Sequence, residues 1–226
     1  MKKTVITIAR SYGSGGKTLG NLLAEDLGIN CYSREILRMA SDESGINEAL
    51  FGEVDEKMKK SPLLFNILKK NPYKGGVLPP ESSDFVSDDN LFNYQAKVIK
   101  DLAAQESCII IGRCADYVLK DNPDVISVFC YSDVEERIQW SIDEYQVPAK
   151  QAKKIVQEKD AQRSRFYEFY TNQKWGNPRN YTLMINTSKM STEETVQLLA
   201  SFYDAKKGIL TFKNAFENQY EKDNKY

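Results

Sequence analysis

Apolar residues in this chain gather into short continuous runs instead of alternating with polar ones. Four runs cover Val5–Ala9, Cys108–Ile111, Ile126–Tyr131 and Leu183–Ile185, and Asn30–Tyr32 is a shorter candidate for a fifth. Continuous apolar runs of this length are typical of parallel strands that are buried on both faces. The pattern therefore predicts a buried parallel sheet.

Between these runs, apolar residues recur at helical spacing. Leu19, Leu22, Leu23 and Leu27 form one such face directly after the first run. Strands that alternate with helices predict an α/β fold with helices on both faces of the sheet. The expected helices are Lys17–Leu27, Arg34–Ser41, Asn90–Gln105, Asp133–Tyr145, Ala149–Tyr170 and Thr192–Lys206.

Residues 60–90 interrupt the alternation. The pairs Gly75-Gly76 and Pro79-Pro80 lie in this stretch, among several further Ser, Asn and Pro residues. A long irregular segment in a compact domain is usually functional or mobile. Part of a substrate-binding lobe and a solvated loop are equally good interpretations.

The first apolar run leads directly into a glycine-rich loop. The loop contains Gly13, Gly15 and Gly16, and Lys17 and Thr18 follow it at the start of the first expected helix. Glycine allows backbone N–H groups to approach a phosphate closely, and a helix N-terminus attracts the same anion. Lys17 is then expected to reach the outer phosphates and Thr18 to offer its hydroxyl to Mg²⁺.

This loop fits the P-loop pattern G-x-x-x-x-G-K-[ST] in two registers. In the first, Gly16, Lys17 and Thr18 match, but Ser11 takes the first glycine position. In the second, residues 13–15 match the G-x-G of nucleoside monophosphate kinases, and Gly16 takes the lysine position. The alternative is a glycine-rich turn without a ligand. The residues expected to bind phosphate are Ser11, Gly13, Ser14, Gly15, Gly16, Lys17 and Thr18.

Composition narrows the chemistry that this chain can perform. The 226 residues include no histidine, which excludes acid–base catalysis by imidazole. The formal net charge is -1, so we expect neither a nucleic acid nor a membrane surface as partner. Cys31, Cys108, Cys114 and Cys130 lack C-x-x-C spacing, so we interpret them as free thiols of a reduced, cytoplasmic protein rather than zinc ligands.

One candidate for a phosphate-binding cation is Arg113. Gly112 and Arg113 directly follow a buried run, which predicts a guanidinium at the carboxyl edge of the sheet, where open α/β sheets bind ligands. Asp116 follows within one turn and is expected to orient Arg113 or to reach a ligand hydroxyl. The alternative is an arginine at a strand end that pairs with a surface carboxylate.

Further cations lie on the expected helices 133–145 and 149–170. Arg163 and Arg165 are about 200° apart around a helix, so both reach one ligand only at a helix end or from opposite sides of a lid. Arg137 is one turn into the earlier helix and is also predicted to point into the site. A charged, solvated helix face is the alternative. Aromatic residues nearby, predicted to pack onto the core rather than to stack on a base, are Phe166, Tyr167, Phe169, Tyr170 and Trp175.

Together these segments resemble the cytidylate kinase-like family of P-loop nucleotide kinases. The matching pieces are residues 6–17, 98–117, 160–167 and 181–188, and the likeness extends over roughly residues 4–203. The order and spacing of the pieces are more specific than any single motif.

The resemblance implies a three-layer α/β/α P-loop kinase domain that transfers the γ-phosphoryl group of ATP, with Mg²⁺, to a nucleoside monophosphate. It divides the single domain 1–226 into a core (about 1–30, 96–147 and 180–206), a substrate-binding lobe (about 31–95), a lid (about 148–179) and a polar tail (207–226). The oligomeric state stays open. The residues assigned to catalysis are Lys17, Arg113, Arg163 and Arg165, and those assigned to substrate binding are Arg34, Arg113, Asp116 and Arg137.

Two other functions are compatible with the same residues. One is a P-loop kinase that phosphorylates a small molecule other than a nucleotide. The other is a nucleotide-binding sensor without turnover, which is favoured by the irregular P-loop and by Cys114, because cytidylate kinases have Asp at that position.

Overall fold

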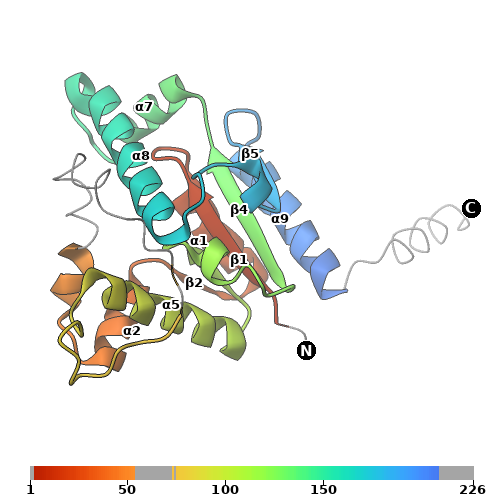
Figure 1. The fold of residues 1–226 in the computed structure, drawn as a ribbon. Coiled ribbons are helices and arrows are strands. Elements are labelled where there is room, and N and C mark those ends of the chain that lie inside the picture. The colour runs from red at the N-terminus through yellow and green to blue at the C-terminus, as the bar shows by residue number, and fades with distance from the viewer. Residues whose placement is uncertain (1–2, 54–72, 74, 209–226) are drawn as a thin grey trace, which may run out of the picture.

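The computed structural model describes residues 3–53, 73 and 75–208. Predictions for residues 54–72 and for the tail beyond 208 therefore lie outside the described residues. Five parallel strands form one sheet, as the apolar runs predicted, and their order is β2-β3-β1-β4-β5, with β1 at the centre (Figure 1). The strands are β1 (Val5–Arg10), β2 (Asn30–Tyr32), β3 (Cys108–Ile111), β4 (Val125–Tyr131) and β5 (Leu183–Asn186).

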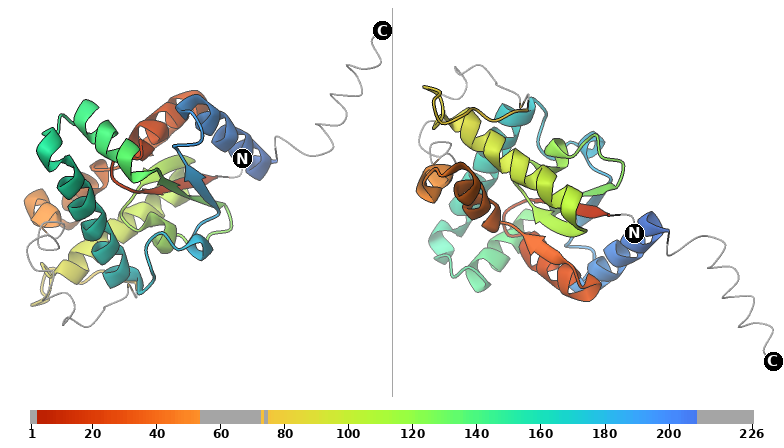
Figure 2. Two further views of the ribbon diagram at one scale, coloured as in Figure 1. Left: turned by 90° about the horizontal axis from the view of Figure 1, so that it is seen from above. Right: turned by 90° about the horizontal axis from the view of Figure 1, so that it is seen from below.

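Helices cover both faces of this sheet, which confirms the predicted α/β/α architecture. Two helices, α1 (Gly16–Leu27) and α9 (Thr192–Lys207), lie on one face, and α5 (Asp88–Gln105) lies on the other (Figure 2). Within residues 3–53 and 75–208, no helix has both the length and the apolar character needed to cross a membrane. The other named helices are α2 (Glu35–Ser44), α6 (Ala115–Val118), α7 (Val134–Asp143), α8 (Ala149–Thr171) and the 3₁₀ helix η1 (Pro178–Asn180).

Burial of the sheet on both faces explains why the strands are continuous apolar runs. Neighbouring residues of a strand point to opposite faces. Ile109 and Ile111 of β3 pack in the core beneath α1 and α9, whereas Cys108 and Ile110 pack in the core beneath α5. Neither face of β3 is therefore left for polar side chains.

Aromatic side chains pack the C-terminal half of α8 onto the core, as predicted. The ring of Tyr170 stacks on that of Phe92 from α5, with ring centroids 4.0 Å apart. Stacked aromatic pairs contribute about 1 kcal/mol beyond the area that they bury. The five predicted aromatic residues all contact this core cluster: Phe166, Tyr167, Phe169, Tyr170 and Trp175.

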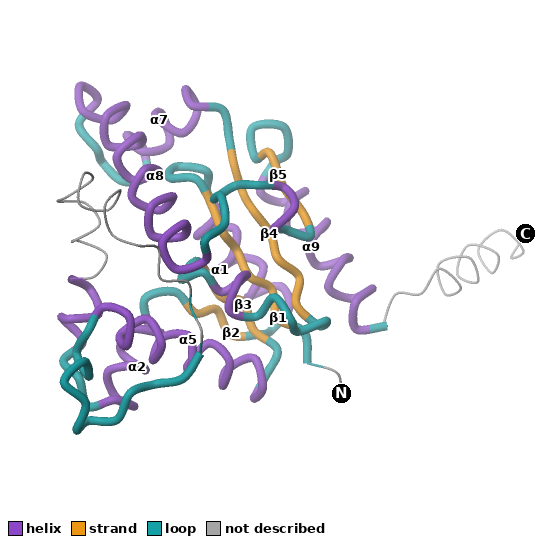
Figure 3. Tube along the Cα trace, viewed as in Figure 1, coloured by secondary structure: helices purple, strands orange, loops and turns teal. Residues whose placement is uncertain are grey.

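Residues 75–87, within the irregular stretch, form a loop that is attached to the start of α5 (Figure 3). The buried side chain of Asn90 accepts a hydrogen bond from the backbone N–H of Leu78 (2.7 Å) and donates one to the backbone oxygen of Phe85 (2.8 Å). The hydroxyl of Ser87 caps α5, so this helix begins two residues before the predicted Asn90.

Candidate functional site

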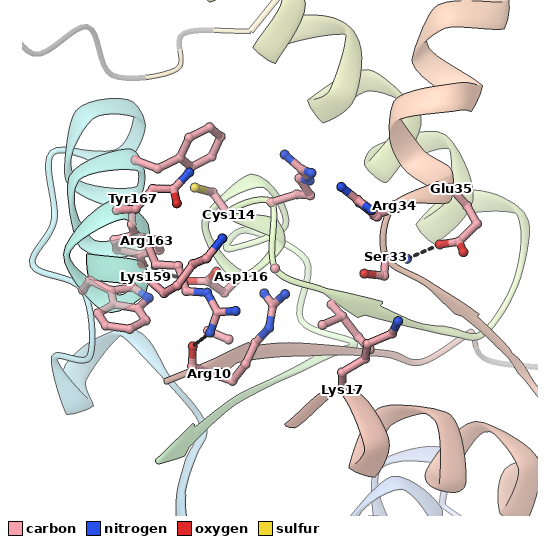
Figure 4. Close-up of a pocket in the computed structure, with 17 residues that line it drawn as sticks. Arg10, Lys17, Ser33, Arg34, Glu35, Cys114, Asp116, Lys159, Arg163 and Tyr167 are labelled. Atoms are coloured by element: carbon pink, nitrogen blue, oxygen red, sulfur yellow. Dashed lines mark hydrogen bonds between the residues drawn. The ribbon is translucent and has the colours of Figure 1, made fainter. Parts of the chain in front are cut away.

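A cavity of about 400 Å³ opens at the carboxyl ends of β1 and β3 (Figure 4). The start of α1, the start of α2 and the helix α8 complete its walls. Among the described residues, only two carboxylates, those of Glu35 and Asp116, line it. This excess of positive charge favours an anionic ligand such as a phosphate ester. The cations that line the cavity are Arg10, Lys17, Arg34, Arg113, Lys159 and Arg163.

The glycine loop ends at an uncapped helix. Gly15 is the N-cap of α1 and has a left-handed backbone (φ +70°) without a capping side chain. No hydrogen-bond acceptor within the described part of the chain contacts the backbone N–H groups of Gly16, Lys17 or Thr18. These three amides are available to an anion, as in other phosphate sites at helix N-termini.

The rest of the loop is held tightly by its neighbours. Gly13 has φ +81°, and a Cβ atom there would lie 2.5 Å from the backbone oxygen of Arg137 in α7. The hydroxyl of Ser14 donates to the backbone oxygen of Ser11 (2.9 Å), and the hydroxyl of Thr187 donates to the backbone oxygen of Ser14 (3.1 Å). These contacts fix the shape of the loop.

Helix α8 is attached to this loop by polar contacts. Asp160 accepts a hydrogen bond from the backbone N–H of Tyr12 (2.7 Å) and forms an ion pair with Arg137. Arg163 donates to the backbone oxygen of Arg10 (2.9 Å). The helix thus covers the end of β1 and directs Arg163 toward the cavity (Figure 4).

An unusual turn carries the cation that follows β3. Gly112, Arg113 and Cys114 are consecutive left-handed residues, with φ of +79°, +58° and +54°. The left-handed conformation costs a non-glycine residue about 1 kcal/mol, and such strain is concentrated at functional sites. The turn brings both Arg113 and Cys114 to the cavity wall.

The structure brings together five of the residues that the sequence predicted for the site: Lys17, Arg34, Arg113, Asp116 and Arg163 all line the large cavity. A second cavity, of about 170 Å³, has Trp140 and Thr187 among its lining residues. Gly13, Ser14 and Gly15 line this second cavity. The predicted residues that line neither of the two cavities are Ser11, Gly16, Thr18, Arg137 and Arg165.

Sequence reasoning missed two cations of the large cavity, Arg10 and Lys159. Arg10 is the last residue of β1, so the argument that identified Arg113 at a strand end also applies to it. We expected the strand to end at Ala9, which left Arg10 outside the sheet edge. Lys159 carried no comparable signal, because it is one of several lysines on α8.

Comparison with known proteins identifies the family of this chain. The model of the cytidylate kinase-like family matches residues 5–189. The chain belongs to the cytidylate kinase-like family. This membership confirms the resemblance seen in the sequence and supports a phosphotransferase that binds a nucleotide. No curated protein matches the chain.

Solved structures agree with this assignment at the level of the fold. An uncharacterised protein from Eubacterium ventriosum ATCC 27560 is 25% identical, with a TM-score of 0.64 over 89% of this chain and 99% of that one. A shikimate kinase from Bacteroides thetaiotaomicron is 12% identical, with a TM-score of 0.51 over 89% of this chain and 98% of that one. This member of the cytidylate kinase-like family therefore has the P-loop kinase fold.

Asp116 lies in a buried hydrogen-bonded pair at the edge of the large cavity. Burial raises the pKa of its carboxyl to about 6, while a hydrogen bond of 2.7 Å from the hydroxyl of Tyr167 lowers it. Desolvation disfavours the carboxylate more strongly than this hydrogen bond stabilises it. Asp116 therefore changes its charge close to physiological pH.

We expect the substitution Tyr167→Phe to raise the pKa of Asp116 above about 6, because the hydroxyl stabilises the ionised carboxylate. Loss of a hydrogen bond to a charged group costs about 1.5 kcal/mol, and this cost applies above the pKa, where Asp116 is ionised. Relative to the wild type, the variant should lose more unfolding free energy at pH 8 than at pH 4. Urea unfolding at the two pH values, with a carbon NMR titration of the carboxyl, measures both effects.

Tyr203→Phe is the matched control for this substitution. Tyr203 is also buried, but its hydroxyl has no hydrogen-bond partner among the described residues. Removing that hydroxyl should leave the unfolding free energy unchanged or higher at both pH values. Equal pH dependence of the two variants would show that the Tyr167 hydroxyl does not stabilise the charge of Asp116.

Proposed function

We propose that the protein transfers the γ-phosphoryl group of ATP to a nucleoside monophosphate. The observation that carries this proposal is the convergence of six cations, from β1, α1, α8, the start of α2 and the turn after β3, on one cavity beside the glycine loop. Phosphoryl transfer requires this kind of site, because its catalysis consists mainly of positioning and of stabilising charge.

The donor is proposed to bind along the glycine loop. The free amides of residues 16–18 would hold its phosphates, and Arg163 would approach them from α8. The smaller cavity, bounded by Trp140 and Thr187, is the proposed space for the base. An indole in the wall of a cavity can stack on a flat aromatic ring.

Mg²⁺ is proposed to bind with the donor. Mg²⁺ is usually bound by substrate phosphates, water and one or two protein oxygens, so it does not need a cluster of protein carboxylates. Thr18, in the first turn of α1, is the proposed protein ligand, and the ion would neutralise charge on the phosphates.

The acceptor is proposed to bind between Arg113 and Arg34. Arg113 would hold its phosphate, because a planar guanidinium can donate two parallel hydrogen bonds to phosphate oxygens. A phosphate monoester already carries a nucleophilic oxygen at neutral pH, so no general base is needed. Helix α8, which forms one wall of the cavity, would limit the access of water that competes for the phosphoryl group.

Acceptor-dependent ADP formation tests this function. Purified protein with Mg²⁺ and ATP should form ADP with at least one member of a panel of nucleoside monophosphates. We expect Arg113→Met to lower kcat/KM for that acceptor about 100-fold, because an oriented guanidinium at the phosphate is lost. The dissociation constant for ATP, measured by calorimetry, should change less than threefold.

Two outcomes would contradict the proposal and select another function. ADP formation only with acceptors other than nucleotides would indicate a small-molecule kinase. Tight ATP binding by folded protein, without turnover on any acceptor, would indicate a nucleotide-binding sensor.

A further inference from the structure

Residues 10 and 16, at the two ends of the glycine loop, lie so close together that their side chains compete for the same space. A Cβ atom at residue 16 would lie 2.8 Å from the Cβ of Arg10 and 3.2 Å from its Cγ. Because real Cβ atoms do not approach each other so closely, a side chain at position 16 requires either glycine at position 10 or a shift of the backbone. Arg10 therefore lies across the first residue of α1, in the space that a side chain from that residue would use.

This contact distinguishes the two registers of the P-loop pattern. Gly15 has the left-handed backbone that calls for glycine, whereas φ of Gly16 is not in the left-handed region. We therefore align the second glycine of G-x-x-x-x-G-K with Gly15. In this register the pattern has glycine at position 10 and lysine at position 16. This chain has the reverse, a cation (Arg10) at the first position and glycine (Gly16) at the second. Glycine and cation have thus exchanged places between two positions that touch.

Arg10 is directed into the cavity next to other guanidinium groups. Its Nη1 atom lies against the Cα of Gly112, where a Cβ atom would collide with it. Burial and the charges of Arg163 and Arg113 lower the pKa of Arg10 to about 9. Among the described residues, the guanidinium of Arg10 has no hydrogen-bond or ion-pair partner. A bound anion would supply the missing partner.

Lys17 lies on the side of the cavity that faces β2 and α2, away from Arg163 on α8 (Figure 4). Its charge acts on Cys31 in β2 and on Glu35 at the start of α2. Arg10 lies between the groups on that side and Arg163 on α8. The two cations are therefore not interchangeable: Lys17 is close to the proposed acceptor side, and Arg10 is close to the lid.

We propose that Arg10 performs the task of the P-loop lysine and contacts the transferred phosphoryl group, while Lys17 contacts the acceptor. Arg10 would bind the outer phosphates of the donor and neutralise the charge that develops on the oxygens of that group. The catalytic role of Arg10 rests on the proposed function. The binding of a polyphosphate by Arg10 does not depend on that function, so binding and catalysis can be tested separately.

Binding of inorganic tripolyphosphate, measured by calorimetry, tests the first part. Arg10→Met should weaken binding at least tenfold, because a charge-assisted contact is lost, and Arg10→Lys should weaken it less. Lys17→Met, the matched loss of a cation, should weaken binding less than threefold. Thermal unfolding of each variant checks that it folds. A stronger effect of Lys17→Met than of Arg10→Met in folded proteins would overturn the inference.

Turnover with the best acceptor tests the second part. Arg10→Met should lower kcat about 10³-fold, as loss of a transition-state arginine does in other phosphotransferases, whereas Lys17→Met should act mainly on the KM of the acceptor. The double variant Arg10→Gly/Gly16→Lys should have a kcat at least tenfold higher than that of Arg10→Met. No recovery in the folded double variant, or a kcat of Arg10→Met close to that of the wild type, would overturn the exchange of roles.

If no nucleoside monophosphate is phosphorylated, the proposed function fails. The tripolyphosphate measurement then still decides whether Arg10 or Lys17 is the phosphate-binding cation.

Discussion

Replacing Asp160 with alanine is expected to destabilise the protein by about 3–5 kcal/mol, the cost of leaving a buried charge without its partner. The side chains of Arg137 and Asp160 are only 11% and 20% exposed. The substitution also removes the acceptor for the backbone N–H of Tyr12. Because α8 loses the contacts of Asp160 with Tyr12 and Arg137, we expect kcat to fall as well. Urea unfolding and the ADP assay measure the two effects.

A second pair on the same helix serves as the control. Glu158 lies 3.8 Å from Lys154, and these side chains are 63% and 78% exposed. Glu158→Ala should change the unfolding free energy by less than about 0.5 kcal/mol, because water screens the exposed pair. The double variant Asp160→Ala/Arg137→Met should regain part of the loss, since no unpaired guanidinium remains. Equal costs for Asp160→Ala and Glu158→Ala would disprove the stabilising role of the buried pair.

Gly13→Ala is expected to cost about 3 kcal/mol, through two separate effects. The left-handed backbone alone costs alanine about 1 kcal/mol. The new methyl group would also lie 2.5 Å from the backbone oxygen of Arg137, so the loop or α7 must move. Either movement displaces the amides that are proposed to hold phosphate. ATP affinity should therefore fall at least tenfold, as measured by calorimetry.

Gly45→Ala separates the two effects. Gly45 is also left-handed (φ +73°), but no heavy atom of the described residues, apart from its two chain neighbours, lies within 4 Å of the position that its Cβ would take. This substitution should cost only about 1 kcal/mol and leave ATP affinity unchanged. If the two variants lose the same stability, the contact of Gly13 with α7 contributes nothing.

The strands of the sheet were predictable because burial on both faces produces continuous apolar runs in the sequence. The run Cys108–Ile111 coincides with β3, and the other strands differ from their predicted ends by no more than a residue. Helix ends were less accurate, since they depend on single side chains. Ser87 starts α5 earlier than periodicity suggests, whereas the cap of α9 by Ser191 could be predicted from the acidic residues that follow it.

The site was predictable only where sequence order determines position. A cation directly after a buried strand must lie at the sheet edge, which identified Arg113. By contrast, the pairing of Arg137 with Asp160 depends on how α7 and α8 pack, and neither spacing nor charge along the chain specifies that packing. Arg10 belongs to both cases. Its place at the end of β1 follows from sequence order, whereas its contact with residue 16 depends on the path of the loop between them.

The close contact between residues 10 and 16 also constrains how such a loop can evolve. A chain that changes from lysine at position 16 to arginine at position 10 must pass through an intermediate. Side chains at both positions collide, and glycine at both leaves the loop without this cation. Neither intermediate is a good phosphate-binding loop, so single substitutions do not connect the two arrangements without a loss. The pair should therefore be inherited together, and its presence would mark a common lineage among related chains.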